Sequence, residues 1–394
     1  MTILEKLNIL GLTSRYDASC GGPQGKKESQ FMPGIYRSTT NDGGCSSLLK
    51  ILLTNYCEYD CAYCVNRNSN NVSRTIFTAD EICKITTEYY NKGLIDGLFL
   101  SSGVLKNPDF TMELMIKAVK RLRLVYNFTG YIHLKIMPGS DYKLIDEAVK
   151  YADRVSVNLE IPSRDGLSKL CPQKNEDSLF KPMVYINEKL SEKKSKKLKL
   201  RSSGQTTQLI VGAIDDNDFQ ILKLADNLYK KIALKRVYYS AFVNVNNLPS
   251  LPNENDRLSL RERRLYQADW LIRLYKFNLD EILKPKSNLS LELDPKTEWA
   301  LKNIEIFPIE INHASYEELL RIPGIGFVSA KKIIEFKKYS PLNMLALDRM
   351  GIRLNKARHF ITVNGKYYGY KGDNIDNLKE ILLEKDSQLS LFTE

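Results

Sequence analysis

The chain contains no long hydrophobic run and only three histidines. Of its 394 residues, 43% are hydrophobic, but no apolar run reaches the roughly 18 residues that a membrane span needs. The first residues also lack the apolar core of a signal peptide, so we expect neither a membrane span nor secretion. Seven cysteines, an odd number, do not suit a disulfide framework. A reducing, cytoplasmic location is therefore predicted.

The charge balance favours a polyanionic partner, because the formal net charge is +11. Part of this excess lies in the stretch Lys189–Arg201, which is rich in lysine. A solvated basic loop and a contact with phosphate groups beside the functional site both explain such a stretch.

Three cysteines with the spacing C-x3-C-x2-C dominate the sequence. Cys57, Cys61 and Cys64 follow the apolar run Leu48–Leu53, which predicts a strand that delivers them to a loop. Thiolates at this spacing can bind three of the four irons of a 4Fe–4S cubane and leave the fourth iron open.

A structural zinc site is the alternative, and it needs four ligands. No fourth cysteine or histidine follows at a finger-like distance, although Cys45 or Cys83 could fold back. The three histidines (His133, His313 and His359) are all distant in sequence. The spacing therefore favours the iron–sulfur cluster.

Apolar runs and amphipathic stretches alternate after a loop-rich lead-in over 14–45. Strands are predicted over 47–54, 97–102, 131–137, 154–160, 206–212 and 236–242. Helices are predicted over 78–92, 110–125, 141–151, 176–190 and 217–231, the first with a capping box at Thr78 and Glu81. Six such β/α units predict an α/β fold, an open partial (β/α)6 barrel with ligands at the carboxyl ends of its strands.

The cysteine motif resembles the signature of the radical S-adenosylmethionine (SAM) enzymes. That resemblance implies that SAM binds the open iron through its amino and carboxylate groups and is cleaved to a 5′-deoxyadenosyl radical. The predicted cofactor-binding residues are Tyr63, Ser101, Ser102, Gly103, Lys135, Asn158 and Glu160. Ser101-Ser102-Gly103 stands where many members have a Gly-Gly-Glu-like turn, and an ordinary strand-to-loop turn is the alternative there.

Polar residues at period two in the strands support this placement. Ser156, Asn158 and Glu160 share one face of the fourth predicted strand, where a fully buried parallel strand would be apolar. We expect Asn158 and Glu160 to contact ribose hydroxyls, and Lys135 to offset a carboxylate or phosphate. A half-exposed strand is the alternative. His133 suits a hydrogen-bonded interior position at least as well as a ligand site, and Gln208 could also point inward.

The C-terminal region resembles a helix-hairpin-helix motif. A helix over 315–321 is predicted to end at a turn containing Gly324, Ile325 and Gly326, and a second helix to begin near Phe327. Backbone N–H groups in such a turn can approach a phosphate closely, with Lys331 and Lys332 placed for neighbouring phosphates. A weaker echo follows over 351–357, so a tandem pair on duplex DNA is predicted, with a purely protein-binding motif as the alternative.

The last residues resemble the peptide with which bacterial DNA enzymes bind the replication sliding clamp. The stretch consists of Gln388, Leu389, Ser390, Leu391 and Phe392, and we expect the preceding helix to end before it. The alternative is that this five-residue peptide occurs by chance.

A closer resemblance covers roughly residues 12–365. It is carried by Tyr16–Cys20, Leu49–Asn55, Tyr63–Arg67, Gly97–Val104, Tyr131–Lys135, Tyr266–Trp270, Asp294–Lys296 and the Pro-Gly-Ile-Gly turn. These segments resemble the DNA modification/repair radical SAM protein family. That family implies DNA as substrate and a partner that resembles uracil-DNA glycosylases.

These patterns predict a radical SAM enzyme that modifies or repairs DNA. The predicted parts are an extension over 1–45, the partial barrel over 46–245, a connecting helix and linker over 246–300, an all-α helix-hairpin-helix domain over 301–365 and a tail over 366–394. Cys171 and Cys20 are the candidate hydrogen donors, with a bystander role as the alternative for each, and Tyr238 is a lesser candidate. An RNA-modifying radical enzyme and a DNA-binding adaptor with a structural metal are the alternative functions.

Overall fold

The computed structural model describes residues 1–14, 33–39, 45–195, 204–253, 257–372 and 374–390. These residues form two compact units, Met1–Asp216 with Lys223–Tyr266, and Asn217–Leu222 with Gln267–Glu394. Cys20 and residues 196–201 of the basic stretch lie outside the described residues. Within the described residues, no helix has both the length and the apolar character needed to cross a membrane.

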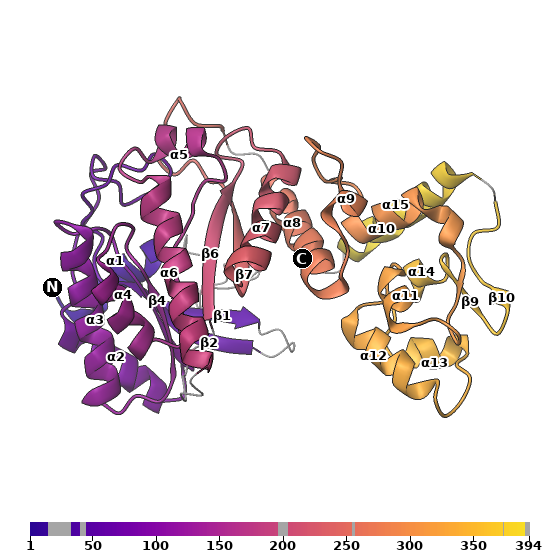
Figure 1. Cartoon of the computed structure of the whole chain (residues 1–394), viewed down its shortest axis with the longest axis horizontal. Helices are drawn as coiled ribbons and strands as arrows, with labels where there is room; N and C mark the ends of the chain where they lie inside the picture. The colour runs from indigo at the N-terminus through magenta and orange to yellow at the C-terminus, as the bar shows by residue number, and fades with distance from the viewer. Residues whose placement is uncertain (15–32, 40–44, 196–203, 254–256, 373, 391–394) are drawn as a thin grey trace. The chain divides into compact units, whose positions relative to one another are not determined.

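A curled seven-stranded sheet forms the centre of the first unit (Figure 1). Its strands follow chain order: β1 (Ile35–Thr39), β2 (Cys45–Leu52), β3 (Gly97–Ser101), β4 (Tyr131–Lys135), β5 (Arg154–Ser156), β6 (Gly204–Val211) and β7 (Arg236–Ala241). Neighbouring strands from β2 to β7 are parallel. The α/β class and the open half-barrel predicted from the sequence are therefore confirmed.

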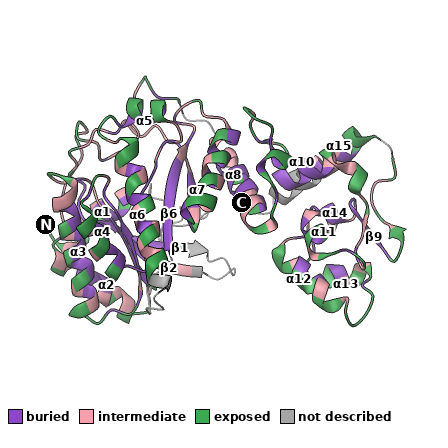
Figure 2. Cartoon of the chain, viewed as in Figure 1, coloured by how far each residue is buried: buried purple, intermediate pink, exposed green. Residues whose placement is uncertain are grey.

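Helices in the connections cover the outer face of this sheet (Figure 1). They are α2 (Ala79–Asn91), α3 (Pro108–Leu124), α4 (Tyr142–Tyr151), α6 (Glu176–Ser195) and α7 (Asp218–Ile232). Helix α5 (Arg164–Leu170) lies at the end of the sheet instead, and α1 (Ile3–Thr13) precedes the sheet. The capping box predicted at the start of α2 is present, because Thr78 and Glu81 each accept a hydrogen bond from the other's backbone N–H. The strands between the helices are buried, as β6 shows along most of its length (Figure 2).

Helix α8 (Arg257–Tyr275) supplies partners for the exposed edge of β7. The Tyr266 hydroxyl accepts a hydrogen bond from the Tyr239 N–H at 2.9 Å and donates one to the Tyr239 carbonyl at 2.8 Å. Glu262 accepts another from the Ala241 N–H at 2.7 Å. These contacts satisfy backbone groups that an edge strand would otherwise leave open.

The structure corrects three expectations for the first unit. The lead-in over 14–45 is not only loop, because β1 pairs antiparallel with β2. The fourth predicted strand is shorter, since β5 ends at Ser156. The start of the basic stretch is helical, because α6 continues to Ser195.

The second unit contains helices and a small sheet. Its elements are α9 (Leu279–Ile282), α10 (Pro295–Lys302), a 3-10 helix (Ile304–Ile306), β8 (Ile309–Glu310), α11 (Tyr316–Arg321), α12 (Phe327–Phe336), α13 (Met344–Arg349), α14 (Leu354–Ala357), β9 (Ile361–Val363), β10 (Lys366–Tyr367) and α15 (Ile375–Ser390). The strands pair in the order β10-β9-β8. The all-α expectation for this region is therefore wrong.

A tight turn at Asn364 and Gly365 explains the unexpected strands. Both residues have positive φ, 52° and 70°, which is the pattern of the two-residue turn that favours Asn-Gly in hairpins. This turn joins β9 to β10 and pairs Val363 with Lys366.

The C-terminal peptide begins inside α15. The helix runs to Ser390, so the expectation that it ends before Gln388 is wrong. The side chains of residues 384–390, and residues 391–394 as a whole, lie outside what the structure describes.

Candidate active site

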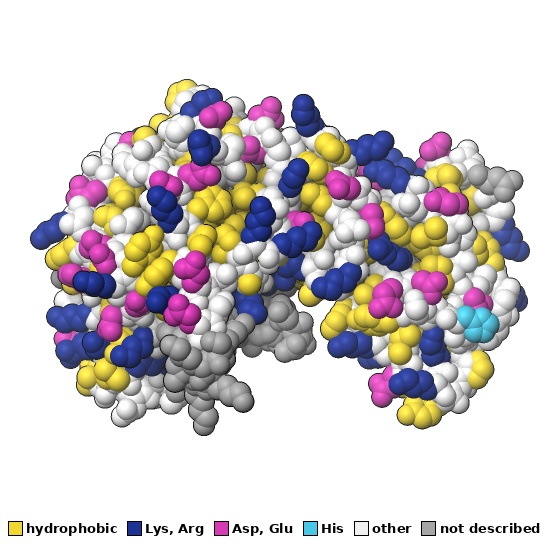
Figure 3. Space-filling model, in the orientation of Figure 1, with side chains coloured by type: hydrophobic (Ala, Val, Ile, Leu, Met, Phe, Trp, Pro, Cys, Tyr) yellow, Lys and Arg dark blue, Asp and Glu magenta, His cyan; other side chains and the backbone are white. Residues whose placement is uncertain are grey.

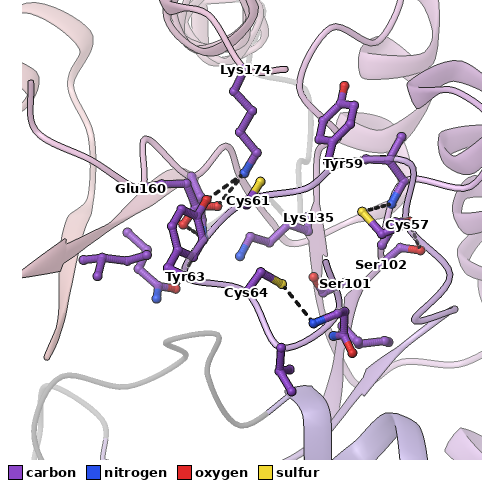
Figure 4. A pocket seen from close by; sticks show the side chains of 18 of the residues that line it. Cys57, Tyr59, Cys61, Tyr63, Cys64, Ser101, Ser102, Lys135, Glu160 and Lys174 are labelled. Carbon is purple, nitrogen blue, oxygen red and sulfur yellow. Dashed lines mark hydrogen bonds and ion pairs between the residues drawn. The ribbon is translucent and has the colours of Figure 1, made fainter. Parts of the chain in front are cut away.

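One cavity in the first unit brings together the residues predicted for the cluster and the cofactor (Figure 4). It lies at the carboxyl ends of the parallel strands, as the sequence analysis expected for this fold. Its lining includes Cys57, Cys61, Tyr63, Cys64, Ser101, Ser102, Gly103, Lys135, Asn158 and Glu160, with Gln208 beside them. Each of the predicted cluster and cofactor residues therefore lines the same space.

Arg74 holds the loop that carries the cysteines. Its guanidinium donates to five backbone carbonyl oxygens, those of Asn55, Asn66, Arg67, Asn68 and Asn70. Because these carbonyls come from both ends of the loop, one side chain fixes its course. Arg74 was not singled out in the sequence, since nothing in its spacing relates it to the cysteines.

Two further side chains complete this frame. Arg67 forms a two-pronged ion pair with Asp60, whose pKa it holds well below the ordinary value. The Asn246 amide donates to the carbonyl oxygens of Ala62 at 2.7 Å and Cys64 at 3.1 Å. The cysteine loop therefore has a defined shape that the protein itself imposes.

The sulfur atoms receive backbone hydrogen bonds that suit cluster ligands. The Val104 N–H donates to Cys57 Sγ and the Asn66 N–H donates to Cys64 Sγ, both at 3.4 Å. Such bonds tune iron–sulfur clusters, so this donor set fits one. Burial raises the pKa of Cys57, and it raises the pKa of Cys64 to about 12.

No three His, Cys, Asp or Glu side chains of the described residues converge as ligands of a single metal ion. A cubane does not require such convergence, because its cysteine ligands bind different iron atoms.

Gly103 allows the turn after β3 to approach the cysteine loop. Its N–H donates to the Thr54 carbonyl at 2.8 Å. A Cβ at this position would lie 2.3 Å from the Tyr56 carbonyl oxygen, so any larger residue would push the loop away. The Ser102 hydroxyl donates to the Gly103 carbonyl at 2.7 Å. The structure therefore gives Gly103 a packing role next to the predicted cofactor contact.

Lys174 is a central polar residue of the cavity that the sequence analysis missed. Its ammonium group lies 3.0 Å from Glu160 Oε1 and 3.2 Å from the Tyr63 hydroxyl (Figure 4). Burial disfavours its charged form, but Glu160 and the nearby thiols raise its pKa well above the ordinary value. Burial and the charge of Glu160 raise the pKa of Tyr63. No motif signals Lys174, because it lies in the loop after α5.

Glu160 is held in an unusual backbone conformation. Its φ is +63°, in the left-handed region that side chains rarely adopt. Its N–H donates to the Gln208 carbonyl and its own carbonyl accepts from the Ile210 N–H. These bonds to β6 hold the residue in place, and strain of this kind is concentrated at functional sites. One carboxylate oxygen of Glu160 faces Lys174, a partner that the sequence analysis did not foresee.

Some of the remaining polar residues of the strands line the cavity, and others are buried in the interior of the sheet. Asn158 donates to Gln208 Oε1 at 3.3 Å, and both residues line the cavity. His133 Nε2 lies 3.0 Å from Ser156 Oγ, and neither residue is part of the cavity lining. Burial lowers the pKa of His133 well below its usual value, so this histidine is neutral.

Cys171 is fully buried beside Cys61 and is not part of the cavity lining. The two thiols share a hydrogen bond, which lowers the pKa of Cys61 and raises that of Cys171. The predicted hydrogen donor thus faces a cluster cysteine, and its role as donor stays a prediction.

The predicted phosphate-binding turn lies between α11 and α12 in the second unit. Gly324 has a φ of +84°, and a Cβ there would lie 2.7 Å from the Arg353 carbonyl oxygen. Among the described residues, the N–H groups of Gly324 and Gly326 have no acceptor, whereas the Phe327 N–H donates to the Tyr275 hydroxyl at 3.3 Å. Lys331 and Lys332 are exposed on α12. Figure 3 shows lysine and arginine side chains over this part of the unit.

The echo at Gly351 differs from the first turn. The Gly351 N–H donates to the Asp348 carbonyl and the Ile352 N–H to the Leu347 carbonyl. Its backbone donors are therefore used within the chain. Lys356 of α14 is buried and pairs with Asp294 at 2.9 Å.

A family model described as the Radical SAM superfamily matches residues 51–228. This superfamily uses a 4Fe–4S cluster and SAM, so the match confirms the two predicted cofactors. No curated protein matches the chain.

Several solved structures are similar to this chain. HydG, a maturase of the FeFe-hydrogenase, has 15% identity, with 54% of this chain and 47% of that chain covered and a TM-score of 0.40. Methylornithine synthase (PylB) has 15% identity, with coverage of 61% and 72% and a TM-score of 0.42. The tagged protein anSMEcpe with bound AdoMet has 13% identity, with coverage of 66% and 63% and a TM-score of 0.35. This chain spans about half the length of the hydrogenase maturase.

Proposed function

We propose that this chain is a radical SAM enzyme that modifies or repairs nucleotides in DNA, because a family model described as the Radical SAM superfamily matches residues 51–228. When bound, the 4Fe–4S cluster and SAM supply a 5′-deoxyadenosyl radical that abstracts hydrogen from the substrate. The observation that carries the proposal is the shared cavity, which joins the three clustered cysteines to the predicted cofactor-binding residues.

Cys57, Cys61 and Cys64 hold the cluster in this proposal. The support is their common place on the cavity wall and the backbone N–H groups that point at two of the sulfur atoms. Arg74 and Asn246 act as positioning residues, because they fix the loop without facing the cavity with a reactive group.

The part of the cavity wall beside the cysteine loop binds SAM in this proposal. Ser101, Ser102 and Gly103 offer hydroxyl and carbonyl oxygens to its amino group, and Lys135 balances its carboxylate. Asn158 is placed to accept and donate hydrogen bonds at ribose hydroxyls. Lys174 pairs with one carboxylate oxygen of Glu160. Glu160 offers the other oxygen, which also accepts a hydrogen bond from the Asn158 amide at 3.5 Å. Tyr63 closes the cavity beside this ion pair.

The second unit binds the DNA backbone in this proposal. The support is the pair of glycine N–H groups without an acceptor in the described part of the chain, at Gly324 and Gly326 on either side of Ile325. A turn of this kind, followed by a helix N-terminus, favours phosphate binding. Lys331 and Lys332 add positive charge one turn further along. Contacts of this kind do not select a sequence, and a target base must leave the stack to reach an enclosed cavity.

Two protein partners are also proposed on the sequence patterns alone. The peptide Gln388–Phe392 suits the sliding clamp, and the family resemblance suggests a partner similar to uracil-DNA glycosylases.

The test is cofactor cleavage in anaerobically reconstituted protein. The chain is loaded with iron and sulfide, reduced and incubated with SAM, with and without duplex DNA, and 5′-deoxyadenosine is measured. We expect cleavage that rises with DNA and is lost in Cys61→Ala. Cys83→Ala is the matched control, because Cys83 is a buried thiol on α2 outside the cavity lining, and it should keep the activity. Intact SAM under all conditions would exclude the proposed reaction.

A further inference from the structure

Three polar side chains lie on the face of the sheet that lines the cavity, but nearer the amino ends of the strands and outside the cavity lining. Arg154, Thr206 and Arg236 come from the neighbouring strands β5, β6 and β7, and Thr206 lies directly opposite Arg236 in the register. Side chains two residues apart on a strand share a face. Thr206 therefore faces the same side as Gln208, which lines the cavity, and the same count places Arg236 with Ser240. We call these three residues the arginine site.

Each residue of the arginine site carries a buried polar atom without a partner. These atoms are Arg154 Nε, Thr206 Oγ1 and Arg236 Nε, none of which has a hydrogen-bond partner among the described residues. Within the same residues, neither arginine forms an ion pair with a carboxylate. Buried donors without partners are rare in folded proteins, and a missing ligand is one physical explanation for them. Three on adjacent strands and one face indicate a single ligand.

Aromatic rings hold both guanidinium groups. Arg154 lies over the ring of Tyr131 at 5.9 Å, and Arg236 lies over the rings of Tyr238 at 5.1 Å and Tyr266 at 5.7 Å. A ring fixes the plane of a guanidinium and leaves its N–H donors free. The donors are thus organised in advance for a planar or tetrahedral oxyanion, the type of group that arginine binds best.

Cations surround the arginine site on the side of His133, whereas the Glu262 carboxylate lies near Tyr266 on the side of Arg236. Burial lowers the pKa of His133, and the charges of Arg154, Lys135 and Lys50 lower it further. His133 is therefore neutral and adds no charge of its own. The group of cations formed by Arg154, Lys135 and Lys50 attracts an anion.

We propose that Arg154, Thr206 and Arg236 bind a phosphate group of the substrate nucleotide. The strands β5 and β7 are two positions apart, roughly 10 Å, and Arg154 lies opposite Gly204, two residues or roughly 7 Å before the level of Thr206 and Arg236. Two long arginine side chains can span this separation around one phosphate. Gln208 follows Thr206 by two residues, so the cavity wall begins roughly 7 Å further along the strand. A phosphate held here directs the attached sugar and base toward the cavity. This inference rests on the proposed function and gives it a substrate contact inside the barrel.

Binding of a minimal nucleotide tests the arginine site. The probe is a dinucleotide with one phosphodiester, compared with the same dinucleotide carrying an uncharged methylphosphonate and with inorganic phosphate. Binding is measured by calorimetry on the reconstituted full chain without reductant, in a Lys331→Gln/Lys332→Gln background that weakens the hairpin contacts. We expect the phosphodiester to bind and the methylphosphonate to lose most affinity. Arg154→Gln and Arg236→Gln should each weaken binding roughly tenfold or more, the range of a charged hydrogen bond.

Matched variants separate recognition from folding. Arg164→Gln removes an exposed arginine of α5 and should leave the affinity unchanged. Arg154→Lys and Arg236→Lys keep the charge and should bind more weakly than wild type but better than the Gln variants. If the Gln variants fail to fold, two comparisons still test the proposal. One is the affinity of the Lys variants, and the other is the affinity of the wild-type arginine site for the phosphodiester and the methylphosphonate.

Equal affinity of the parent and the Gln variants, or of the phosphodiester and methylphosphonate, would overturn the proposal. So would binding of inorganic phosphate alone with no binding of the dinucleotide. The binding measurement does not depend on SAM cleavage. A chain that never forms 5′-deoxyadenosine would contradict the proposed function, but the binding test of the arginine site would remain valid.

Discussion

At the scale of single residues, Lys174 controls the ionic balance of the cavity. Its side chain and that of Glu160 are only 11% and 12% exposed, so each charge depends on the other. Removing one partner of a buried pair leaves an uncompensated charge, which costs more than the pair itself contributes.

We expect Lys174→Met to lower the free energy of unfolding by about 3 kcal/mol, the range for breaking a buried ion pair. Adding Glu160→Gln should recover part of that loss, because no unpaired charge then remains. Urea unfolding measures both variants. Lys181→Met is the control, since its pair with Asp177 is exposed and its removal should cost at most about 0.5 kcal/mol. Equal losses for Lys174→Met and Lys181→Met would contradict this account.

A second buried lysine supports the hairpin turn. Lys296 is 8% exposed, and its ammonium group donates to the Ile325 carbonyl at 2.6 Å and lies 4.9 Å from the centre of the Tyr275 ring. Burial lowers its pKa to about 7, although Asp294 acts in the opposite direction. Asp294, the N-cap of α10, also pairs with Lys356 of α14. The start of α10 therefore contacts both the turn at Gly324–Gly326 and the helix that follows Gly351.

The lowered pKa of Lys296 predicts a pH-dependent stability. Between pH of about 7 and 10.5, the unfolded chain keeps a proton on this lysine that the folded chain has released. Stability therefore rises with pH across that window, by up to about 1.4 kcal/mol per pH unit, and is flat with respect to this group below it. In unfolding measurements from pH 6 to 10, Lys296→Met should lose this slope and Lys302→Met, at an exposed position, should keep it. A parallel slope in Lys296→Met would show that other groups cause the dependence.

At the scale of elements, the parallel core of the sheet was predictable and its periphery was not. The strands from β2 to β7 are apolar runs between amphipathic helices, and this pattern marks them. β1 was missed because Ile35–Thr39 is a short run whose pairing depends on β2. The hairpin of β9 and β10 had a local signal, the Asn364-Gly365 turn, which was not used.

The sequence predicted only those residues of the candidate site that belong to a spaced motif or to the period of a strand. The cysteines and the strand residues Lys135 and Asn158 follow from motif and period. Lys174 and Arg74 act through contacts that only the folded chain creates, so no sequence interval marks them. Glu160 was predictable only in part. The alternation of polar residues in its strand predicted that its side chain faces the cavity, but neither its left-handed backbone nor its ion pair with Lys174 could be predicted.

The hairpin turn should tolerate a side chain at one glycine and not at the other. Gly324→Ala places a Cβ 2.7 Å from the Arg353 carbonyl at a φ of +84°, whereas Gly351 has a φ of +75° and open space around it. We expect Gly351→Ala to cost about 1 kcal/mol from backbone strain alone and Gly324→Ala clearly more. Urea unfolding compares the two, and equal costs would mean that the turns do not pack as described.

At the scale of the whole molecule, the two units divide the proposed chemistry. The first unit contains the cavity and the arginine site, and the second contains the turn at Gly324 and Gly326. Nonspecific DNA affinity should therefore depend on the second unit and respond to salt.

Neutralising Lys331 and Lys332 should flatten the salt dependence of duplex binding. Each phosphate contact contributes a slope of about −0.9 to the logarithm of the binding constant against that of salt concentration. We expect Lys331→Gln/Lys332→Gln to make the slope less steep by about 1.8. Fluorescence anisotropy at several salt concentrations measures it. Lys230→Gln, on the exposed surface of α7, should change nothing, and an unchanged slope in the double variant would place the DNA elsewhere.

The contacts that hold the cysteine loop determine what happens to the protein when a bound cluster is lost. Arg74, Asn246 and the Asp60–Arg67 pair hold the loop through contacts that contain no metal. A zinc finger loses its fold with its ion, because the ion supplies the folding energy. Here the contacts that shape the loop come from the polypeptide, so we expect the loop to keep its shape when oxygen destroys a bound cluster. We therefore expect the same protein to accept a new cluster without refolding.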